Sequence, residues 1–132
     1  MAEAVRPFPY PDRDTAPFWA AQDRHELQFQ RCSACGTVRY PVGPLCPQCH
    51  SFDFEWITSP GRGTIYSYTV VRHQTHPAFP TPYTVLLVEL DEGPRLIAQL
   101  RPSNAGFAIG SRVRVEWEDG PHQSLPVFVV GD

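Results

Sequence analysis

Residues 28–51 read QFQRCSACGTVRYPVGPLCPQCHS and contain all four cysteines of the chain. They form two Cys-x-x-Cys pairs, Cys32 with Cys35 and Cys46 with Cys49, which are separated by ten residues. Two residues inside each pair let backbone amides fold over a thiolate, and the connection brings the second pair back to close a tetrahedron. The spacing therefore predicts a zinc ribbon with these four side chains as ligands.

Three other uses of the cysteines fit less well. Residues 46–50 match the haem attachment pattern Cys-x-x-Cys-His, but the only methionine is Met1 and the first cysteine pair would then have no role. A thioredoxin-like redox pair needs a helix in a βαβ unit, and disulfides are typical of secreted chains. Four thiolates close the coordination shell of zinc, so we expect a structural metal that leaves no cysteine as a nucleophile.

Composition narrows the function further. The chain has 132 residues and a formal net charge of −3, and its eleven basic residues are all arginine. Without lysine it cannot form a Schiff base or a P-loop, and the acidic balance disfavours nucleic-acid binding. The N-terminal sequence does not resemble a signal peptide, and no stretch approaches 18 apolar residues. We therefore expect a cytoplasmic protein that does not bind membranes.

The region before the cysteines is expected to hold one helix. Residues 1–13 read as an extended arm, with Phe8 and Tyr10 as candidate anchors. A spacing near 3.6 predicts a short helix over roughly 15–27, capped by Asp14 or Thr15.

The region after the cysteines is rich in Val, Ile, Leu, Tyr and Phe, which predicts strands. The expected strands are 54–58, 63–73, 83–90, 95–100, 112–117 and 127–130, with one helical turn over 106–110. Five strands from residue 63 onward suit a small Greek-key barrel of the OB type. The predicted fold is mainly β: an N-terminal arm and helix (1–30), a rubredoxin-like zinc ribbon (31–58) and a five-stranded OB-fold (59–132).

Other candidates for chemistry are weak. No Ser/His/Asp constellation follows from the spacing, and the acidic cluster Glu89, Asp91 and Glu92 reads as a solvated hairpin tip. Phe79 lies in a proline-rich loop, HQTHPAFPTPY (73–83), from which it cannot easily reach the interior of a small barrel. That loop is therefore predicted to be a contact surface.

Several motifs in their order along the chain resemble one family. They are Phe18-Trp19, Cys32-Ser-Ala-Cys35-Gly36, Cys46-Pro-Gln-Cys49, Trp56, SPGRGTIYSYTV (59–70), Pro82-Tyr83 and VELDEGPRL (88–96). Together they are similar to the zinc-ribbon and OB-fold proteins that accompany thiolases, long catalogued as a domain of unknown function. One departure is His50, where members of that family often have glycine.

The resemblance implies a subunit that is not itself an enzyme and that supports a catalytic partner. The partner is expected to be a thiolase or a lipid-transfer-type aldolase acting on acyl-CoA, including steroid side chains, in a heterotetramer with two copies of each chain. Phe18, Trp19, Phe79 and Tyr83 are the candidate partner-binding residues, with acyl-CoA at the interface. Because guanidinium pairs well with phosphate, Arg62 and Arg72 are candidates for the CoA phosphates.

A second hypothesis keeps the same fold and changes the function. An OB-fold with a zinc ribbon can bind single-stranded nucleic acid, with Tyr66, Tyr68 and Phe79 as stacking platforms. The acidic balance and the absence of lysine weigh against this alternative.

Overall fold

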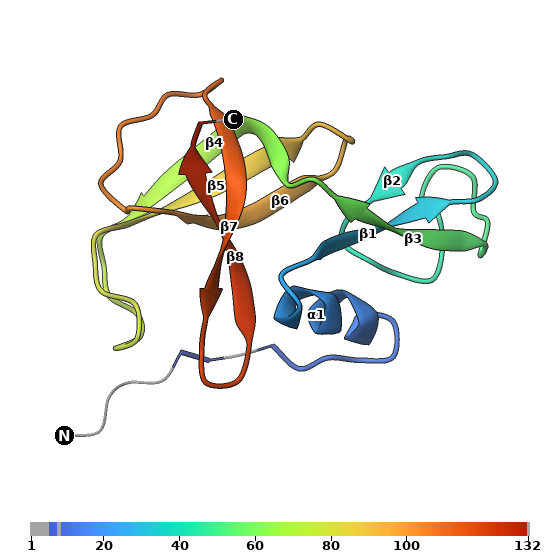
Figure 1. Ribbon diagram of the computed structural model, residues 1–132, viewed down its shortest axis with the longest axis horizontal. Helices are drawn as coiled ribbons and strands as arrows, with labels where there is room; N and C mark the ends of the chain where they lie inside the picture. The colour runs from blue at the N-terminus through green and yellow to red at the C-terminus, as the bar shows by residue number, and fades with distance from the viewer. Residues whose placement is uncertain (1–5, 8, 132) are drawn as a thin grey trace.

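The computed structural model describes residues 6, 7 and 9–131, and it consists of a helix, a small sheet and a barrel (Figure 1). The elements in chain order are α1 (Ala16–Asp23), β1 (Leu27–Cys32), β2 (Val38–Arg39), β3 (Phe54–Ser59), β4 (Arg62–Val71), β5 (Tyr83–Leu90), β6 (Arg95–Leu100), β7 (Arg112–Asp119) and β8 (Ser124–Val130). The predicted mainly β fold is confirmed. Phe8, proposed as an anchor of the N-terminal arm, lies outside the described residues.

Helix α1 is shorter than the predicted 15–27. Thr15 is the N-cap but makes no side-chain capping bond. The Asp12 carboxylate accepts the backbone N–H groups of Asp14 at 2.9 Å and Thr15 at 2.8 Å instead, just before the helix begins. The helix ends at Asp23 because His25 adopts a left-handed conformation with φ of 60°. That residue turns the chain directly into β1.

Strands β1, β2 and β3 form the antiparallel sheet of the ribbon, in the order β2-β1-β3. Pairing between β1 and β3 runs from Leu27 opposite Ser59 to Cys32 opposite Phe54. Strand β3 leads into β4 through a short turn, so the ribbon sheet is joined directly to the barrel (Figure 1).

The barrel is closed, with the strand order β4-β5-β6-β8-β7. All neighbours are antiparallel except β6 and β8, which run parallel. This is the five-stranded Greek-key arrangement expected of an OB-fold. The predicted helical turn over 106–110 is wrong: residues 101–111 form an irregular connection, and Gly110 there has a φ of 97° that an α-helix does not accept.

Gly63 allows β4 to pass close to β5. A Cβ atom at this position would meet the carbonyl oxygen of Glu89 and would lie 2.9 Å from the Cγ1 of Val88. Any side chain here would therefore push the two strands apart, because both neighbours belong to a paired strand.

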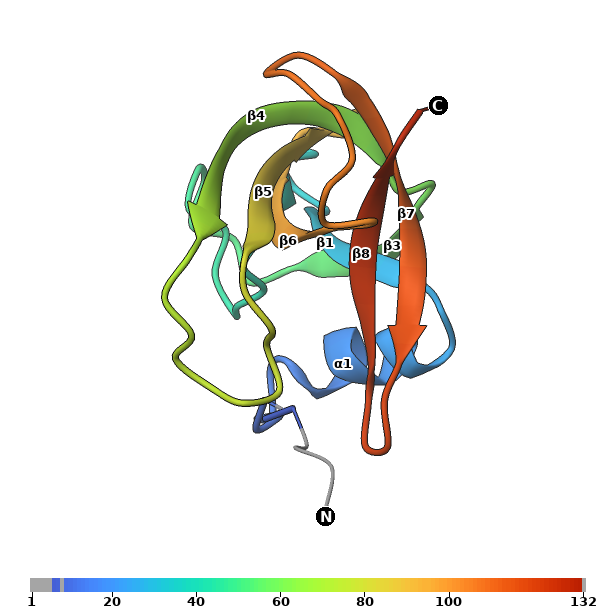
Figure 2. The ribbon, with the colours of Figure 1, turned by 90° about the vertical axis from the view of Figure 1, so that its left-hand side faces the viewer.

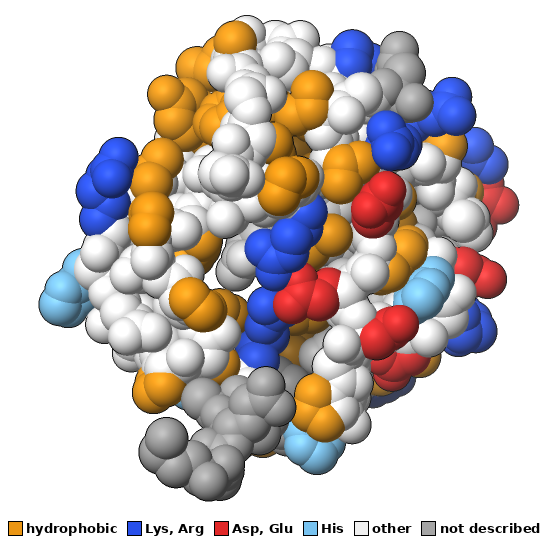
Figure 3. Space-filling view, turned by 60° about the vertical axis from the view of Figure 1, so that its left-hand side comes forward, with side chains coloured by type: hydrophobic (Ala, Val, Ile, Leu, Met, Phe, Trp, Pro, Cys, Tyr) orange, Lys and Arg blue, Asp and Glu red, His pale blue; other side chains and the backbone are white. Residues whose placement is uncertain are grey.

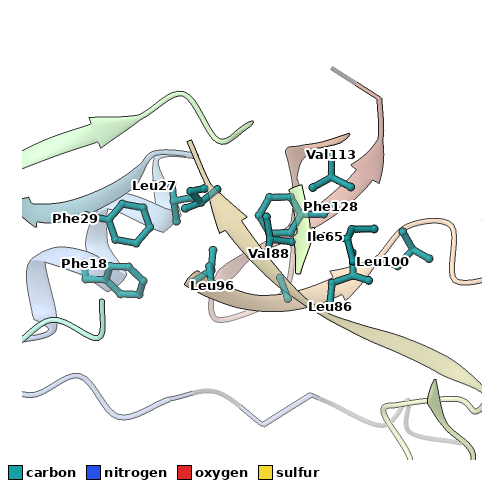
Figure 4. Close-up of a cluster of buried hydrophobic side chains, with 12 residues drawn as sticks. Phe18, Leu27, Phe29, Ile65, Leu86, Val88, Leu96, Leu100, Val113 and Phe128 are labelled. Carbon is teal, nitrogen blue, oxygen red and sulfur yellow. The ribbon is translucent and has the colours of Figure 1, made fainter. Parts of the chain in front are cut away.

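One continuous core joins the helix, the ribbon and the barrel (Figure 4). Its buried members are Phe18, Leu27, Phe29, Ile65, Leu86, Val88, Leu90, Leu96, Ala98, Leu100, Val113 and Phe128. The first three come from α1 and β1 and the rest from the barrel, so the metal module packs as a part of the same core. No helix among the described residues is long and apolar enough to cross a membrane.

Candidate functional site

The four cysteines converge at the end of the ribbon as the spacing predicts. The Sγ atoms of Cys32, Cys35, Cys46 and Cys49 all lie within 4.8 Å of one another. Across the two pairs, Cys32 lies 3.5 Å from Cys49, and Cys35 lies 3.6 Å from Cys46. Two of the thiols are buried and two are exposed. This is one cluster of four sulfur donors that suits a single tetrahedral ion.

Each cysteine pair sits in a tight turn of the same design. The N–H of Gly36 donates to the carbonyl of Cys32 at 2.9 Å, and the N–H of His50 donates to the carbonyl of Cys46 at 2.9 Å. Both closing residues have positive φ, 81° at Gly36 and 65° at His50. A glycine adopts this conformation freely, whereas a histidine does so at a cost. This cost falls at His50, the position where the chain departs from the glycine of the family that it resembles.

The thiols of the cluster have pKa values that are shifted in opposite directions. The hydroxyl and backbone N–H of Thr37 lower the pKa of Cys35 to about 6. At Cys49 the backbone N–H of Ser51 favours the thiolate, but the crowded thiol of Cys32, desolvation and the remaining cysteines outweigh it and raise the pKa to about 12. Four thiols this close together cannot all lose their protons without a cation, because the negative charges repel one another. A divalent ion offsets this repulsion. The donor set therefore fits zinc, and its closed shell assigns the metal a structural role.

One carboxylate, that of Asp119, contacts both a histidine and a serine hydroxyl, but not as a catalytic triad. His25 Nε2 lies 2.7 Å from Asp119 Oδ1, and its ring stacks on Trp117. The Ser124 hydroxyl donates to the same carboxylate and not to the histidine. These two contacts lower the pKa of Asp119, that from Ser124 more than that from His25. Because the imidazole does not contact the hydroxyl, the arrangement is not that of a Ser/His/Asp triad, and these contacts join the end of α1 to the β7–β8 hairpin.

The four predicted partner-binding residues differ in how exposed they are. Phe18 is only 2% exposed and packs against Tyr40 and Phe29 in the core, so it offers little surface of its own to a partner. Trp19 and Phe79 are half-buried, and both line one surface hollow of about 250 Å³. Tyr83 is also half-buried, with its ring 6.0 Å from that of Phe79. Trp19, Phe79 and Tyr83 therefore lie in one region, as a docking role requires.

The hollow lies where three parts of the chain meet. Figure 2 shows α1 between the β4–β5 loop on one side and the β7–β8 hairpin on the other. Trp19 belongs to α1, Phe79 to the loop, and Leu125 and Pro126 to β8. Its further lining residues are Arg6, Pro7, Phe18, Gln22, Tyr40, Leu96, Ile97, Ala98, Gln99 and Val127.

The apolar surface continues from the hollow over the outer face of β5 and β6. Ile97 is 65% exposed and pairs across the strands with Leu87, which is half-buried. Ile97 also lines a second, shallower hollow of about 210 Å³ together with Leu87 and Val85. We call the surface formed by Trp19, Phe79, Tyr83, Val85, Leu87 and Ile97 the apolar face.

Charged side chains meet close to this surface. The Glu118 carboxylate accepts from Arg6 at 2.6 Å and also from Arg101. Arg6 in addition lies over the ring of Phe79, 5.2 Å from its centroid. In Figure 3 hydrophobic side chains spread over one side of the molecule, with basic and acidic groups in contact near its middle.

The two arginines predicted for CoA phosphates lie at opposite ends of one strand. Arg62 is the first residue of β4 and Arg72 follows its last residue, and both are exposed. Ten residues of strand at about 3.3 Å each place roughly 30 Å of chain between them. An assignment of either arginine to CoA stays a prediction.

Sequence reasoning missed two residues of this region. Ile97 is recognisable in principle, because in residues 95–100 it stands on the polar side of the alternation, between Arg95 and Gln99. Gln22, which is 1% exposed, stands four residues after Phe18 and so on the same face of the helix, although a polar residue on a short helix is usually expected to face water.

Comparison with known proteins supports the fold and the metal site. Residues 19–55 match the family model described as the ChsH2 rubredoxin-like zinc ribbon domain, and residues 56–118 match the ChsH2 C-terminal OB-fold domain. The predicted zinc ribbon and OB-fold are thereby confirmed.

The relatives are mostly subunits of acyl-CoA enzymes. A probable enoyl-CoA hydratase alpha subunit of Thermomonospora curvata is 46% identical over 132 residues, covering 96% of this chain and 40% of that protein. The 3-oxo-4,17-pregnadiene-20-carboxyl-CoA hydratase alpha subunit of Mycobacterium tuberculosis is 40% identical, covering 89% of this chain and 38% of that protein. The chain thus spans about 40% of the length of these relatives.

Two shorter relatives are matched over more of their own length, and their names are not those of hydratase subunits. A DUF35 domain-containing scaffold protein of Methanocaldococcus jannaschii is 33% identical, covering 75% of this chain and 77% of that protein. The benzoylsuccinyl-CoA thiolase subunit BbsA of Thauera aromatica is 30% identical, covering 67% of this chain and 61% of that protein.

A solved structure shares the whole architecture. A chain of the Ltp2-ChsH2(DUF35) aldolase superposes with a TM-score of 0.84 at 43% identity, covering 93% of this chain and 98% of that one. The chain belongs to the DUF35 family, in which it carries the ChsH2-type zinc ribbon and OB-fold domains.

Proposed function

We propose that this chain is a non-catalytic subunit that docks on a thiolase-superfamily enzyme acting on acyl-CoA. The observation that carries the proposal is the apolar face, which combines the exposed Ile97 with aromatic side chains beside a hollow. Monomeric proteins rarely expose such contiguous apolar surface unless it binds something. The four thiols belong to the metal cluster, and the chain has no lysine, so the nucleophile of the reaction has to come from the partner.

The names of the relatives support the class of partner. One solved relative is part of an aldolase with Ltp2, and BbsA is a thiolase subunit. We therefore propose a thiolase or a lipid-transfer-type aldolase as the partner, in an assembly of two copies of each chain. The relative from M. tuberculosis is named for a steroid acyl-CoA, which supports steroid side-chain degradation as the setting. Acyl-CoA then binds at or near the interface, and the ribbon stabilises the docking surface.

The nucleic-acid alternative relies on Tyr66 and Tyr68, whose side chains are 49% and 47% exposed, and on Phe79. OB-folds bind nucleic acids on the face that corresponds to β5 and β6 and on the adjoining loops. Here that face presents the aliphatic side chains of Val85, Leu87 and Ile97, and Tyr68 lines the same hollow. The Tyr66 ring is covered by the guanidinium of Arg95 at 3.8 Å, and the edge of Tyr68 packs against Phe107. The aromatic rings proposed for stacking are thus already in contact with side chains of the chain itself.

The contribution of Ile97 to docking can be estimated from its exposure. Burying an entire aliphatic side chain contributes about 1.5–3 kcal/mol, so covering the 65% that is exposed contributes about 1–2 kcal/mol. This corresponds to roughly 5- to 30-fold in affinity. A carboxylate in the same place also loses its hydration, so Ile97→Asp is expected to weaken docking by at least that factor.

Ile109 is a matched control. It is 64% exposed but lines neither of the hollows. We expect isothermal titration of recombinant Ltp2 into the zinc-loaded chain to give binding for the wild type and for Ile109→Asp, and weak or no binding for Ile97→Asp. Equal affinities of the two variants would contradict the proposed docking surface. No binding of any partner enzyme by the wild type would contradict the proposed function.

A further inference from the structure

Arg39 is a buried cation without an acidic partner. The residue is 6% exposed, and its guanidinium bonds only neutral groups: Nε donates to Oε1 of Gln30 at 2.9 Å, and Nη2 donates to the carbonyl oxygen of Gly43 at 3.1 Å. Nη1 is buried without a partner, and no carboxylate in the part of the chain that the structure describes forms an ion pair with Arg39. A buried charge is costly unless an opposite charge balances it. The balancing charge is therefore to be sought inside the ribbon.

Strand pairing places this cation beside the cysteine cluster. Gln30 and Cys32 lie two residues apart in β1 and so point to the same face of the ribbon sheet. Arg39 of β2 lies opposite Gln30. Phe54 of β3 lies opposite Cys32, and the guanidinium carbon of Arg39 lies 5.2 Å from the centroid of its ring. Because β1 runs between β2 and β3, this contact crosses the face of β1 beside Gln30 and Cys32.

The same contacts hold the segment that leads to the second cysteine pair. Oε1 of Gln30 also accepts the N–H of Gly43 at 2.9 Å, so both backbone polar groups of Gly43 are bound by side chains of β1 and β2. Gly43 stands three residues before Cys46, whose thiol is buried in the cluster. Arg39 therefore lies between the strand that carries Cys32 and the segment that carries Cys46.

The metal-loaded cluster supplies the missing negative charge. Four thiolates around one Zn²⁺ leave a net charge of about −2. Glu55, the acidic residue of β3, points to the other face of the sheet, where it pairs with Arg31. Asp53 stands before the strand and is exposed to water. The thiolates on the face of Cys32 are thus the anionic groups that the guanidinium of Arg39 can meet inside the ribbon.

We propose that Arg39 is the buried counter-ion of the zinc cluster, and that Gln30 positions it by accepting its Nε–H without neutralising it. An amide oxygen leaves the full positive charge of the guanidinium available to the thiolates, whereas a carboxylate in its place would cancel that charge. The attraction stabilises the loaded cluster relative to the metal-free one, so Arg39 raises the affinity of the chain for zinc. The inference concerns the isolated chain and does not rest on the proposed function.

The zinc affinity of the isolated chain, measured by competition with a chromophoric chelator, tests this role. Gln30→Glu can keep the hydrogen bonds to Arg39 and Gly43 while it neutralises the cation. We expect its Kd for zinc to be about 10- to 100-fold weaker than that of the wild type, the range usual for residues that act on a metal through its ligands. Arg39→Met, which removes the charge, should weaken binding more than Arg39→Lys, which keeps one. Arg31→Met is the matched control, because Arg31 is the sequence neighbour of Cys32 but lies on the opposite face, paired with a carboxylate, and its Kd should equal that of the wild type.

Cobalt(II) absorption separates an effect of charge from an effect of shape. We expect the d–d bands of cobalt-loaded Gln30→Glu to match those of the wild type, because the four ligands and their tetrahedral geometry are retained. A wild-type zinc Kd for Gln30→Glu would overturn the inference. Equal Kd values for Arg39→Lys and Arg39→Met would also overturn it, because the loss would then not depend on charge. Weaker binding by Gln30→Glu together with altered cobalt bands would show that the residue acts by shape alone, and this result too would refute the role of the cation.

Discussion

Removal of the metal is expected to unfold the ribbon and leave the barrel folded. Residues 33–53 bury only Arg39 and Cys46, so this segment has almost no apolar core of its own. Strand β1 adds two fully buried side chains, Leu27 and Phe29. At about 1.5–3 kcal/mol each, these contribute about 3–6 kcal/mol, whereas a structural zinc contributes about 10–16 kcal/mol. The metal therefore dominates the stability of this segment.

The barrel keeps a core that does not involve the metal. Leu86, Val88, Leu100, Val113 and Phe128 are all fully buried, and they lie on four different barrel strands. Without zinc we expect this core to persist, at a reduced stability because its contacts with Leu27 and Phe29 weaken.

Hydrogen–deuterium exchange with mass spectrometry tests this prediction, with the zinc content measured on the same samples. After treatment with a chelator, peptides from residues 33–53 should exchange at the rate of an unfolded chain, while peptides from β5 and β6 stay protected. Replacement of one ligand, Cys49→Ser, should give the same pattern. Protection of residues 33–53 after loss of the metal would refute the reasoning, and so would loss of protection throughout the barrel.

Three further predictions concern the fold. Gly63→Ala should lower the free energy of unfolding by about 1–3 kcal/mol, because its Cβ meets a carbonyl oxygen of β5, whereas Gly106→Ala, with nothing within 4 Å of the added carbon, should be nearly neutral in the same urea titration. His50→Gly should raise the unfolding midpoint by relieving about 1 kcal/mol of left-handed strain, and a decrease would show that the side chain is needed. The hydrogen bonds from Arg112 lower the pKa of Asp91, so this contact stabilises the fold above pH 3.8 and is lost as the pH falls below that value. The difference in unfolding midpoint between wild type and Asp91→Asn should therefore shrink in acid, and a constant difference would contradict the assignment.

The sequence predicts the features that depend on local pattern. The spacing of the four cysteines is sufficient for the ribbon, since two residues within each pair define a turn by themselves. The strand predicted over 112–117 is found as β7, where Val113 is fully buried and its neighbours Arg112 and Arg114 are partly exposed. These regularities involve residues close together in the chain.

The features that escaped prediction depend on contacts between distant segments. The end of α1 at Asp23 follows from the left-handed backbone of His25, a conformation that few histidines adopt. The burial of Phe18 follows from the approach of Tyr40. The hollow exists only because α1, the β4–β5 loop and the barrel meet.

The central claim is that this chain functions by binding an enzyme. Native mass spectrometry of the zinc-loaded chain mixed with recombinant Ltp2 tests this claim most directly, because it reports which chains associate and in what numbers. The account predicts a dominant species that contains both chains, with two copies of each. A spectrum with only the separate proteins at micromolar concentration, repeated with the thiolase that functions with BbsA, would contradict it.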